Sequence, residues 1–275
     1  FMTCTNKSIN INTPNGIVNS IDMSLLKLTN TAGVFVITSN DNDFQIDGVF
    51  TNITTSPAVE FINGKWDFGY SSFSNCNDAI HFTGTSDSEL SLYKPIIEYC
   101  DNGIYFDSPG SFRITNYGTF ESIGTAVEVY QSKSIILSAE FTSVDTPILV
   151  DTPGTISISD SQITESGRSS ITTSSMDSSV LEIRSTGNMG GFTIVGGVWD
   201  IESTFTDISF GGNGGALTLY GNSGSIFNFQ DSRFTNTIST GNGGAIYSEN
   251  GSVIIDSCIF SYCEANNGGG LYSIG

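Results

Sequence analysis

Hydrophobic residues recur along this chain as a short phrase that returns about every 21 to 29 residues. Each phrase has a lead residue, which is Phe or Ile. A small residue lies two places before the lead, and another residue, apolar in most repeats, lies three places after it. The lead residues are Phe50, Phe73, Ile97, Phe120, Phe141, Ile163, Phe205, Phe234 and Phe260. A period of this size is typical of a solenoid, in which each repeat buries its face only against neighbouring repeats.

Each repeat divides into three expected strands, A, B and C. Strand A alternates just before the phrase, as in Trp66/Phe68; strand B is the phrase itself; strand C alternates after a short turn, as in Ile80/Phe82. Alternation with a period of two places both members of a pair on one face of a strand. The pattern therefore predicts an all-β fold, a right-handed parallel β-helix (a solenoid) of about 10–11 coils of three short strands, with coils stacked roughly 4.8 Å apart.

The same pattern predicts a single β-helix domain over residues 1–275, with irregular N-terminal coils over 1–43 and regular coils over 44–275. One lead residue is missing between Ile163 and Phe205, where the interval matches about two coils. After the last expected strand C there is no polar cap, which solenoids normally carry. We therefore expect either a segment of a longer repeat protein or end-to-end self-association into a filament, because an unclosed head-to-tail contact propagates.

Two positions of the phrase predict corners between strands. The small residue before the lead predicts a tight corner between strands A and B that leaves no room for a large side chain. It is Gly48, Ser71, Pro95, Gly118, Ala139, Ser161, Ser203, Ser232 or Cys258. Two places after the lead, Asn52, Asn75, Asp207 and Asn236 favour a left-handed backbone, which Asn and Asp tolerate. Stacked amides would also bond from coil to coil; the alternative is Asn in a polar surface loop.

Composition narrows the environment and the partners. Charged residues are 13% of the chain, and nine Lys and Arg against 28 Asp and Glu give a formal net charge of −19. This charge argues against nucleic acid and against polyanionic substrates, both of which need clustered cations. No apolar run approaches the roughly 18 residues of a membrane span, and no signal peptide opens the chain. Abundant Ser, Thr and Asn with few Lys predict an extracellular or cell-surface protein.

Three glycine motifs near the end of the chain carry a family resemblance. Gly214-Gly215-Ala216-Leu217, Gly243-Gly244-Ala245-Ile246 and Gly268-Gly269-Gly270-Leu271 each follow a Gly/Asn-rich loop and open a strand C. With Phe234 and Phe260 upstream, they resemble polymorphic outer-membrane-protein repeats, marked by Gly-Gly-Ala-Ile and Phe-x-x-Asn on a pectin-lyase-like right-handed parallel β-helix. Here Asn follows Phe234 by two places rather than three, and the third motif lacks its Ala. The resemblance implies a surface-displayed or secreted fibre with adhesive or structural roles.

Catalytic residues do not emerge from the sequence. Inverting glycosidases need two carboxylates roughly 6.5–9.5 Å apart, whereas the acids here are expected to scatter. Asp160, Asp231 and Asp256 are expected to share a turn position between strands A and B, and each precedes Ser, which is turn chemistry. The only histidine, His81, is expected to point outward from a strand C. The four arginines, Arg113, Arg168, Arg184 and Arg233, have no Lys or Arg at an equivalent site in the next coil.

Metal and cofactor chemistry is also poorly supported. The run Asp41-Asn42-Asp43 and the glycine-rich loops offer oxygen atoms, but they lack the Asp spacing of calcium-binding nonapeptide repeats. The loop Gly211–Gly215 lacks the Lys-Ser/Thr pair of a phosphate-binding loop. We expect neither a cofactor nor a metal.

Cysteines and glycosylation sequons mark candidate modification sites. Cys76 and Cys100 occupy the same place in adjacent coils, where they would form a disulfide or a small apolar ladder. Cys258 and Cys263 share one coil and would pair across its corner. Sequons occur at Asn250, Asn6 and Asn52, and Asn250 is expected to be the most exposed.

Together these patterns predict an extracellular structural or adhesive β-helical fibre without a catalytic site. The alternative is a polysaccharide-binding or polysaccharide-degrading β-helix, of the lyase or hydrolase kind. Outward carboxylates and aromatic residues gathered in one groove would favour the alternative, and scattered ones would favour the fibre.

Overall fold

The computed structural model describes residues 10–13, 26–29, 35–39, 43–46, 48–54, 57–187 and 191–275, with side chains from residue 48 onward. The described residues form parallel strands and no helix, which confirms the predicted fold class. The chain divides into two compact units, residues 1–140 and 141–275, which together contain about ten solenoid turns with three strands per coil. The expectation of one domain over the whole chain stays a prediction.

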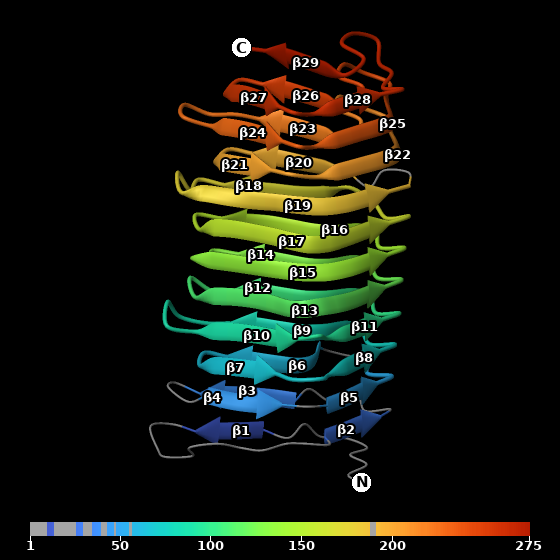
Figure 1. The fold of residues 1–275 in the computed structure, drawn as a ribbon. Coiled ribbons are helices and arrows are strands. Elements are labelled where there is room, and N and C mark those ends of the chain that lie inside the picture. The colour runs from blue at the N-terminus through green and yellow to red at the C-terminus, as the bar shows by residue number, and fades with distance from the viewer. Residues whose placement is uncertain are drawn as a thin grey trace. The chain divides into compact units, whose positions relative to one another are not determined.

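The strands C build one face of each unit, here called the C sheet (Figure 1). In the first unit its strands are β1 (Asn10–Thr13), β3 (Phe35–Ser39), β6 (Pro57–Ile62), β9 (Asp78–Thr83), β12 (Asn102–Asp107) and β14 (Thr125–Tyr130). In the second unit they are β16 (Thr146–Thr152), β18 (Ser169–Thr173), β20 (Phe192–Val195), β23 (Leu217–Tyr220), β26 (Ile246–Glu249) and β29 (Leu271–Ile274).

Strands A and B build a second face, here called the AB sheet. Its strands in the first unit are β2 (Leu26–Thr29), β4 (Asp43–Ile46), β5 (Gly48–Thr51), β7 (Lys65–Phe68), β8 (Ser72–Ser74), β10 (Glu89–Tyr93), β11 (Ile96–Glu98) and β13 (Ser111–Glu121). The boundary between the units falls within β15 (Ser134–Thr142). The second unit adds β17 (Thr155–Thr164), β19 (Ser178–Thr186), β21 (Val198–Ile201), β22 (Thr204–Phe210), β24 (Ile226–Gln230), β25 (Arg233–Ser239), β27 (Ser252–Asp256) and β28 (Ile259–Ser261).

In the middle coils strand A continues into strand B without a break. They fuse into the single long strands β13, β15, β17 and β19. The corner survives there as an irregularity inside a continuous strand: the register between β17 and β19 shifts between Ile158 and Ser161, and Asp160 has a φ of 48°. A bulge of this kind bends a strand without ending its ladder.

Lead residues form the core rungs, as the repeating phrase predicts. Phe50 stacks on Phe73 with ring centroids 4.6 Å apart in the first unit, and Phe205, Phe234 and Phe260 stack in turn in the second. The missing lead is Ser185, which the ladder places between Ile163 and Phe205 and which is fully buried. The interval of 42 residues between Ile163 and Phe205 therefore contains two coils, and one of them has a polar residue, Ser185, in the core position of the lead.

The corner after the lead residue adopts the left-handed backbone that its Asn residues predict. Asn52, Asn75, Asp207 and Asn236 have φ between 51° and 57°. Tyr99 and Tyr262 occupy the same place in other coils with φ of 54° each, so the corner imposes the conformation even on residues that disfavour it. A side-chain hydrogen bond also joins neighbouring coils, since Asn236 Nδ2 donates to Asp207 Oδ1 at 2.6 Å.

Small residues before the lead do more than make room. At Gly118 a Cβ would lie 3.0 Å from Pro95 and from Ile114, as the steric expectation requires. The serines at this place also supply hydrogen bonds. Ser232 Oγ accepts from the Ser203 amide at 3.0 Å and donates to the Ile201 carbonyl at 3.0 Å. Ser203 Oγ makes the same two contacts with the coil below it, so the hydroxyl replaces ladder bonds that the corner interrupts.

Truncation of a corner serine should leave two buried backbone groups without partners. We expect Ser232→Ala to lower the free energy of unfolding by about 1–3 kcal/mol, the usual cost of an unsatisfied buried polar group. Ser232→Cys should lose less, because Cys258 occupies this place in the next coil. Urea unfolding of both variants, with the exposed Ser209→Ala as control, checks this; equal stability of Ser232→Ala and the parent would refute the role of the hydroxyl.

One buried hydroxyl among the described residues has no partner, that of Ser169. It lies in a core rung of the C sheet, aligned with Phe192 in the next coil, and it is fully buried. Because an unsatisfied buried hydroxyl is unfavourable, Ser169→Ala should raise the free energy of unfolding by up to about 1 kcal/mol. Its neighbour Ser170, which points outward, provides the control. A loss of stability on Ser169→Ala, measured by urea unfolding, would show that the hydroxyl has a partner.

Candidate functional site

The outward face of the C sheet in the first unit aligns aromatic and acidic residues from successive coils. The parallel register places Glu60 beside His81, His81 beside Tyr105, and Tyr105 beside Glu128. A second outward row lies at the start of β9, β12 and β14 and contains Asp78, Asn102 and Thr125. These residues come from β6, β9, β12 and β14, so the stacking of coils brings together residues that are more than twenty positions apart in sequence.

A small hollow of about 180 Å³ opens between the two rows. We call it the C-face pocket. The polar side chains that line it are Asp78, His81, Asn102, Tyr105, Thr125 and Glu128. Asp78 is held in place by Asn102 Nδ2, which donates to its Oδ1 at 2.7 Å, and Glu128 accepts from the Tyr130 hydroxyl at 2.6 Å.

The walls of the C-face pocket are aromatic and its field is negative. His81 and Tyr105 meet edge to face with centroids 4.6 Å apart, and Tyr130 lies 5.8 Å from Tyr105. The four strands beneath contain no Lys or Arg. Burial, followed by the nearby charges of Asp107 and Glu128, raises the pKa of Tyr105 above its ordinary value. The carboxylates of Asp107 and Glu128 are therefore close enough to act electrostatically on the ring.

His81 points outward from strand C as predicted, but it is not an isolated surface residue. Sequence reasoning missed its neighbours because Tyr105 and Glu128 stand out only when the coils are aligned in register. The signal was present in the strand C positions themselves: Glu60, His81, Tyr105 and Glu128 each lie between the two buried members of the apolar pair.

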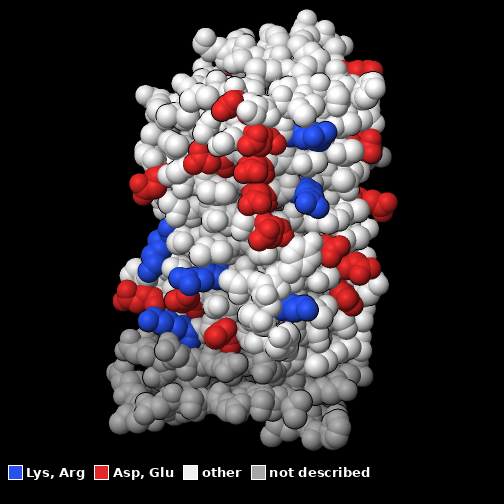
Figure 2. Space-filling view, in the orientation of Figure 1, with Lys and Arg blue, Asp and Glu red and all other residues white. Residues whose placement is uncertain are grey.

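Acidic residues on the second unit form a column, so the expectation that the acids scatter is wrong there. Figure 2 shows acidic side chains following one another across successive coils. At the corner between strands A and B, Asp160, Glu182, Glu202 and Asp231 are all exposed, one in each of four coils. Neighbouring coils are roughly 4.8 Å apart, which is closer than the carboxylates of an inverting glycosidase.

The expected grouping of Asp160, Asp231 and Asp256 also needs correction. Asp256 aligns with Gln230, and Ser257 rather than Asp256 takes the left-handed corner that Asp160 and Asp231 occupy. Within the described part of the chain, no group of three or more His, Cys, Asp or Glu side chains is arranged to hold a metal ion. The run Asp41-Asn42-Asp43 lies largely outside the described residues.

Arg168 has a role that sequence reasoning missed. Its guanidinium donates to the carbonyls of Phe192, Gly214 and Gly215 and to the hydroxyls of Thr193 and Thr218, at 2.7–3.1 Å. It also lies 4.1 Å from the ring centroid of Phe210. Burial lowers its pKa to about 10, which leaves it charged at neutral pH. One side chain therefore fastens the loop Gly211–Gly215 to strands two coils below.

The glycine motifs serve the stacking of these loops. A Cβ on Gly215 would lie 2.1 Å from the Gly244 carbonyl oxygen, and one on Gly244 would lie 2.0 Å from that of Gly269. Asn213 Oδ1 accepts from the Asn242 amide at 2.9 Å, and Asn267 Nδ2 donates to Asn242 Oδ1 at 2.7 Å. Close backbone approach and an amide ladder therefore account for the motifs without a bound phosphate.

Candidate modification sites lie at corners. Asn52 and Asn250 are exposed and left-handed, while Asn6 falls outside the described residues. The structure shows no disulfide bond among the four cysteines of the described region, Cys76, Cys100, Cys258 and Cys263. Cys100 Sγ accepts from the Cys76 amide at 3.4 Å, a contact like that of the corner serines. The bond with the Cys76 thiol and burial raise the pKa of Cys100. Both disulfides stay predictions.

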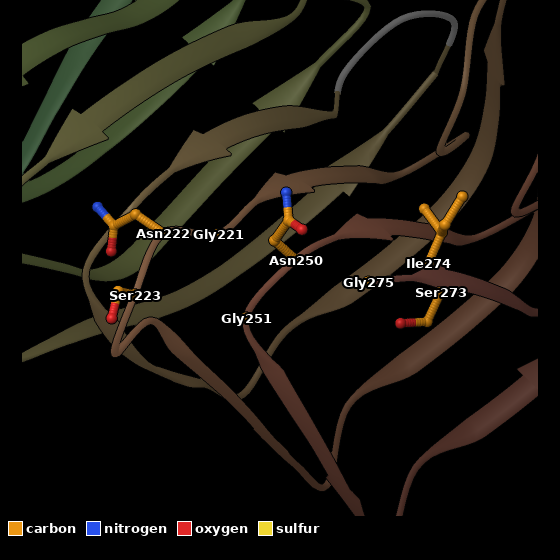
Figure 3. A pocket seen from close by; sticks show the side chains of 8 residues that line it. All are labelled: Gly221, Asn222, Ser223, Asn250, Gly251, Ser273, Ile274 and Gly275. Atoms are coloured by element: carbon orange, nitrogen blue, oxygen red, sulfur yellow. The ribbon is translucent and has the colours of Figure 1, made fainter.

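A larger hollow of about 540 Å³ lies beside Asn250 in the second unit (Figure 3). It is lined by Gly221, Asn222, Ser223, Asn250, Gly251, Ser273, Ile274 and Gly275. None of these residues bears a charged or nucleophilic side chain suited to catalysis, apart from the ordinary serine hydroxyls. The hollow therefore offers hydrogen bonding rather than chemistry.

Comparisons with protein-family models, with curated proteins and with solved structures find no match to this chain. Among the described residues, no helix is long and apolar enough to cross a membrane. We therefore infer function from the geometry of the C-face pocket, the acidic column and the stacking of the coils.

Removal of the Arg168 side chain should release the loop that it fastens. We expect Arg168→Leu to lower the free energy of unfolding by roughly 3 kcal/mol, because three carbonyls lose a charged donor. Hydrogen exchange of the Gly211–Gly215 amides should accelerate by at least about tenfold. The exposed Arg184→Leu is the matched control and should change neither quantity. Unaltered exchange in Arg168→Leu would contradict the fastening role.

Proposed function

We propose that this chain is a structural or adhesive β-solenoid that is secreted or displayed at a cell surface. The observation that carries the proposal is that each repeating position has a role in the fold. Leads pack as core rungs, corner residues adopt the left-handed backbone, and buried hydroxyls bridge interrupted ladders. Such a chain grows by the addition of coils, which is what a fibre or a long display scaffold requires.

The coil that contains β27, β28 and β29 has features that would let another coil stack on it. Ile255, which aligns with the buried Phe229 of the coil beneath, is 39% exposed. Open edges with apolar rungs are templates for strand addition. We propose that another coil covers this face, supplied either by a longer version of the same chain or by a second copy stacked end to end.

The family and the environment belong to the same proposal. The close Gly215–Gly244–Gly269 approach is support for a kinship with polymorphic outer-membrane-protein repeats on a pectin-lyase-like right-handed β-helix. The exposed sequons Asn52 and Asn250 suit an extracellular glycoprotein. A net charge of −19 keeps nucleic acid from being a suitable partner.

A polysaccharide-binding or polysaccharide-degrading β-helix is the second candidate function. The observation in its favour is the C-face pocket, where Tyr105, Asn102 and two carboxylates line one hollow. Binding is better supported than cleavage, because the two carboxylates of the pocket already accept hydrogen bonds, Asp78 from Asn102 and Glu128 from Tyr130. A release of reducing ends from a neutral polysaccharide would establish this candidate in place of the fibre.

End-to-end assembly makes a prediction that light scattering and electron microscopy can check. The purified chain should form rods whose mean length rises with concentration. Ile255→Asp, which places a charge on the exposed rung, should shorten them, because desolvating a carboxylate in a strand interface is costly. Ile254→Asp, on the adjacent outward position, should leave rod length unchanged. A chain that stays monomeric at high concentration would speak against assembly by copies and leave only the longer-chain form of the proposal.

A further inference from the structure

The C-face pocket has the size of a site for one chemical group rather than for a whole ligand. Its volume of about 180 Å³ is below the roughly 300–1,000 Å³ of small-molecule sites. It lies on regular strands, because Asp78, Tyr105 and Glu128 project from β9, β12 and β14. Sites on strands hold their geometry better than sites on loops. An occupant would therefore be the end of a side chain presented by a partner.

The charges around the pocket determine whether a positive or a negative side chain would bind there. Four carboxylates, Glu60, Asp78, Asp107 and Glu128, lie on the outward face of four neighbouring strands that contain no Lys or Arg. The one ion pair among the described residues joins Arg113 to Glu89 on the AB sheet. An anion would be repelled here, and a cation would be attracted.

Aromatic rings supply the second half of a cation site. His81, Tyr105 and Tyr130 form a continuous row of ring contacts beside these carboxylates. A cation that lies over a ring face is attracted by the quadrupole of the ring, and more strongly where water is partly excluded. A ring flanked by carboxylates is a better partner for a guanidinium or an ammonium than for a neutral hydroxyl group.

The same chain shows how it binds a guanidinium elsewhere. Arg168 is held by one ring, Phe210, and by five oxygen acceptors, none of them a carboxylate. The C-face pocket offers the same two kinds of contact, aromatic rings and oxygen acceptors, and adds negative charge. The described residues that line the pocket include no Lys or Arg.

We propose that the C-face pocket is a docking site for a cationic side chain, the guanidinium of arginine or the ammonium of lysine, presented by a basic peptide or protein. Tyr105 and His81 contact the flat or methylene part of the side chain, and Asp78 and Glu128 accept its N–H groups. The inference names the partner chemistry of the adhesive function proposed above and rests on it. Attraction of this kind weakens with salt, because the pocket is partly exposed.

His81 is the only histidine of the chain, so its ring protons report on this pocket alone. We would titrate the full chain at low salt with a blocked tetra-arginine peptide and follow the His81 ring signals by NMR. The matched probe is tetra-citrulline, which has the same shape without the charge. A third arm uses a neutral cellotetraose. The proposal expects a saturable shift with tetra-arginine that is at least about tenfold tighter than with either neutral probe.

Variants separate the pocket from general attraction to an acidic protein. Tyr105→Leu and Glu128→Gln should each weaken tetra-arginine binding by roughly five- to tenfold, as measured by calorimetry. The controls are Glu182→Gln in the acidic column and Tyr93→Leu at an exposed tyrosine of the AB sheet, and both should change tetra-arginine binding less than about twofold. Far-ultraviolet circular dichroism shows whether each variant keeps its strands, and both outward positions lie outside the core.

Each remaining outcome overturns the proposal. A His81 shift with cellotetraose but not with tetra-arginine would assign the pocket to a glycan. Equal losses in Glu128→Gln and Glu182→Gln would show diffuse electrostatic attraction without a site. No shift with any probe would show that the pocket binds none of these groups. Rod formation is measured separately, so assembly can succeed while cation docking fails, and the reverse.

Discussion

The coil-to-coil hydrogen-bond ladder is the interaction on which this structure depends, and its corners are where it is most vulnerable. Between corners, parallel strands satisfy each other's amides and carbonyls. At a corner the backbone turns away and leaves groups inside the solenoid that water does not reach. The buried hydrophilic side chains of the described residues are all serines and threonines. A hydroxyl both accepts and donates, so one such residue replaces two missing ladder bonds, as Ser232 and Ser203 show.

This constraint explains why the corner residue is small and often polar. A larger polar side chain would not fit, and an alanine would leave the backbone groups unsatisfied. At another position, three places after the lead, Cys100 and Cys263 show that a thiol serves in the same way, since their sulfurs accept from an amide or a hydroxyl of the coil below. The cysteines at this place therefore have a structural role whether or not a disulfide forms.

Side chains that point outward need neither to be small nor to bond to the backbone. The register of the strands decides which of them lie side by side. On the C sheet of the first unit it aligns Glu60, His81, Tyr105 and Glu128; at a corner of the second unit it aligns Asp160, Glu182, Glu202 and Asp231. In the corner row of the second unit, like charges in coils roughly 4.8 Å apart repel each other, so that row does not contribute to stability. Such rows persist more readily as surfaces for partners than as parts of the fold.

The sequence by itself determined the repeat, the all-β coil, the lead rungs and the left-handed corners, because each depends on residues close together in one coil. It did not reveal that Ser185 replaces a lead, that strands A and B fuse in β13, β15, β17 and β19, or that Asp256 is out of line with Asp231. The C-face pocket and the Arg168 contacts also came only from the tertiary structure. They join residues from different coils, and their alignment depends on where each corner adds or omits a residue, which shifts every side chain beyond it.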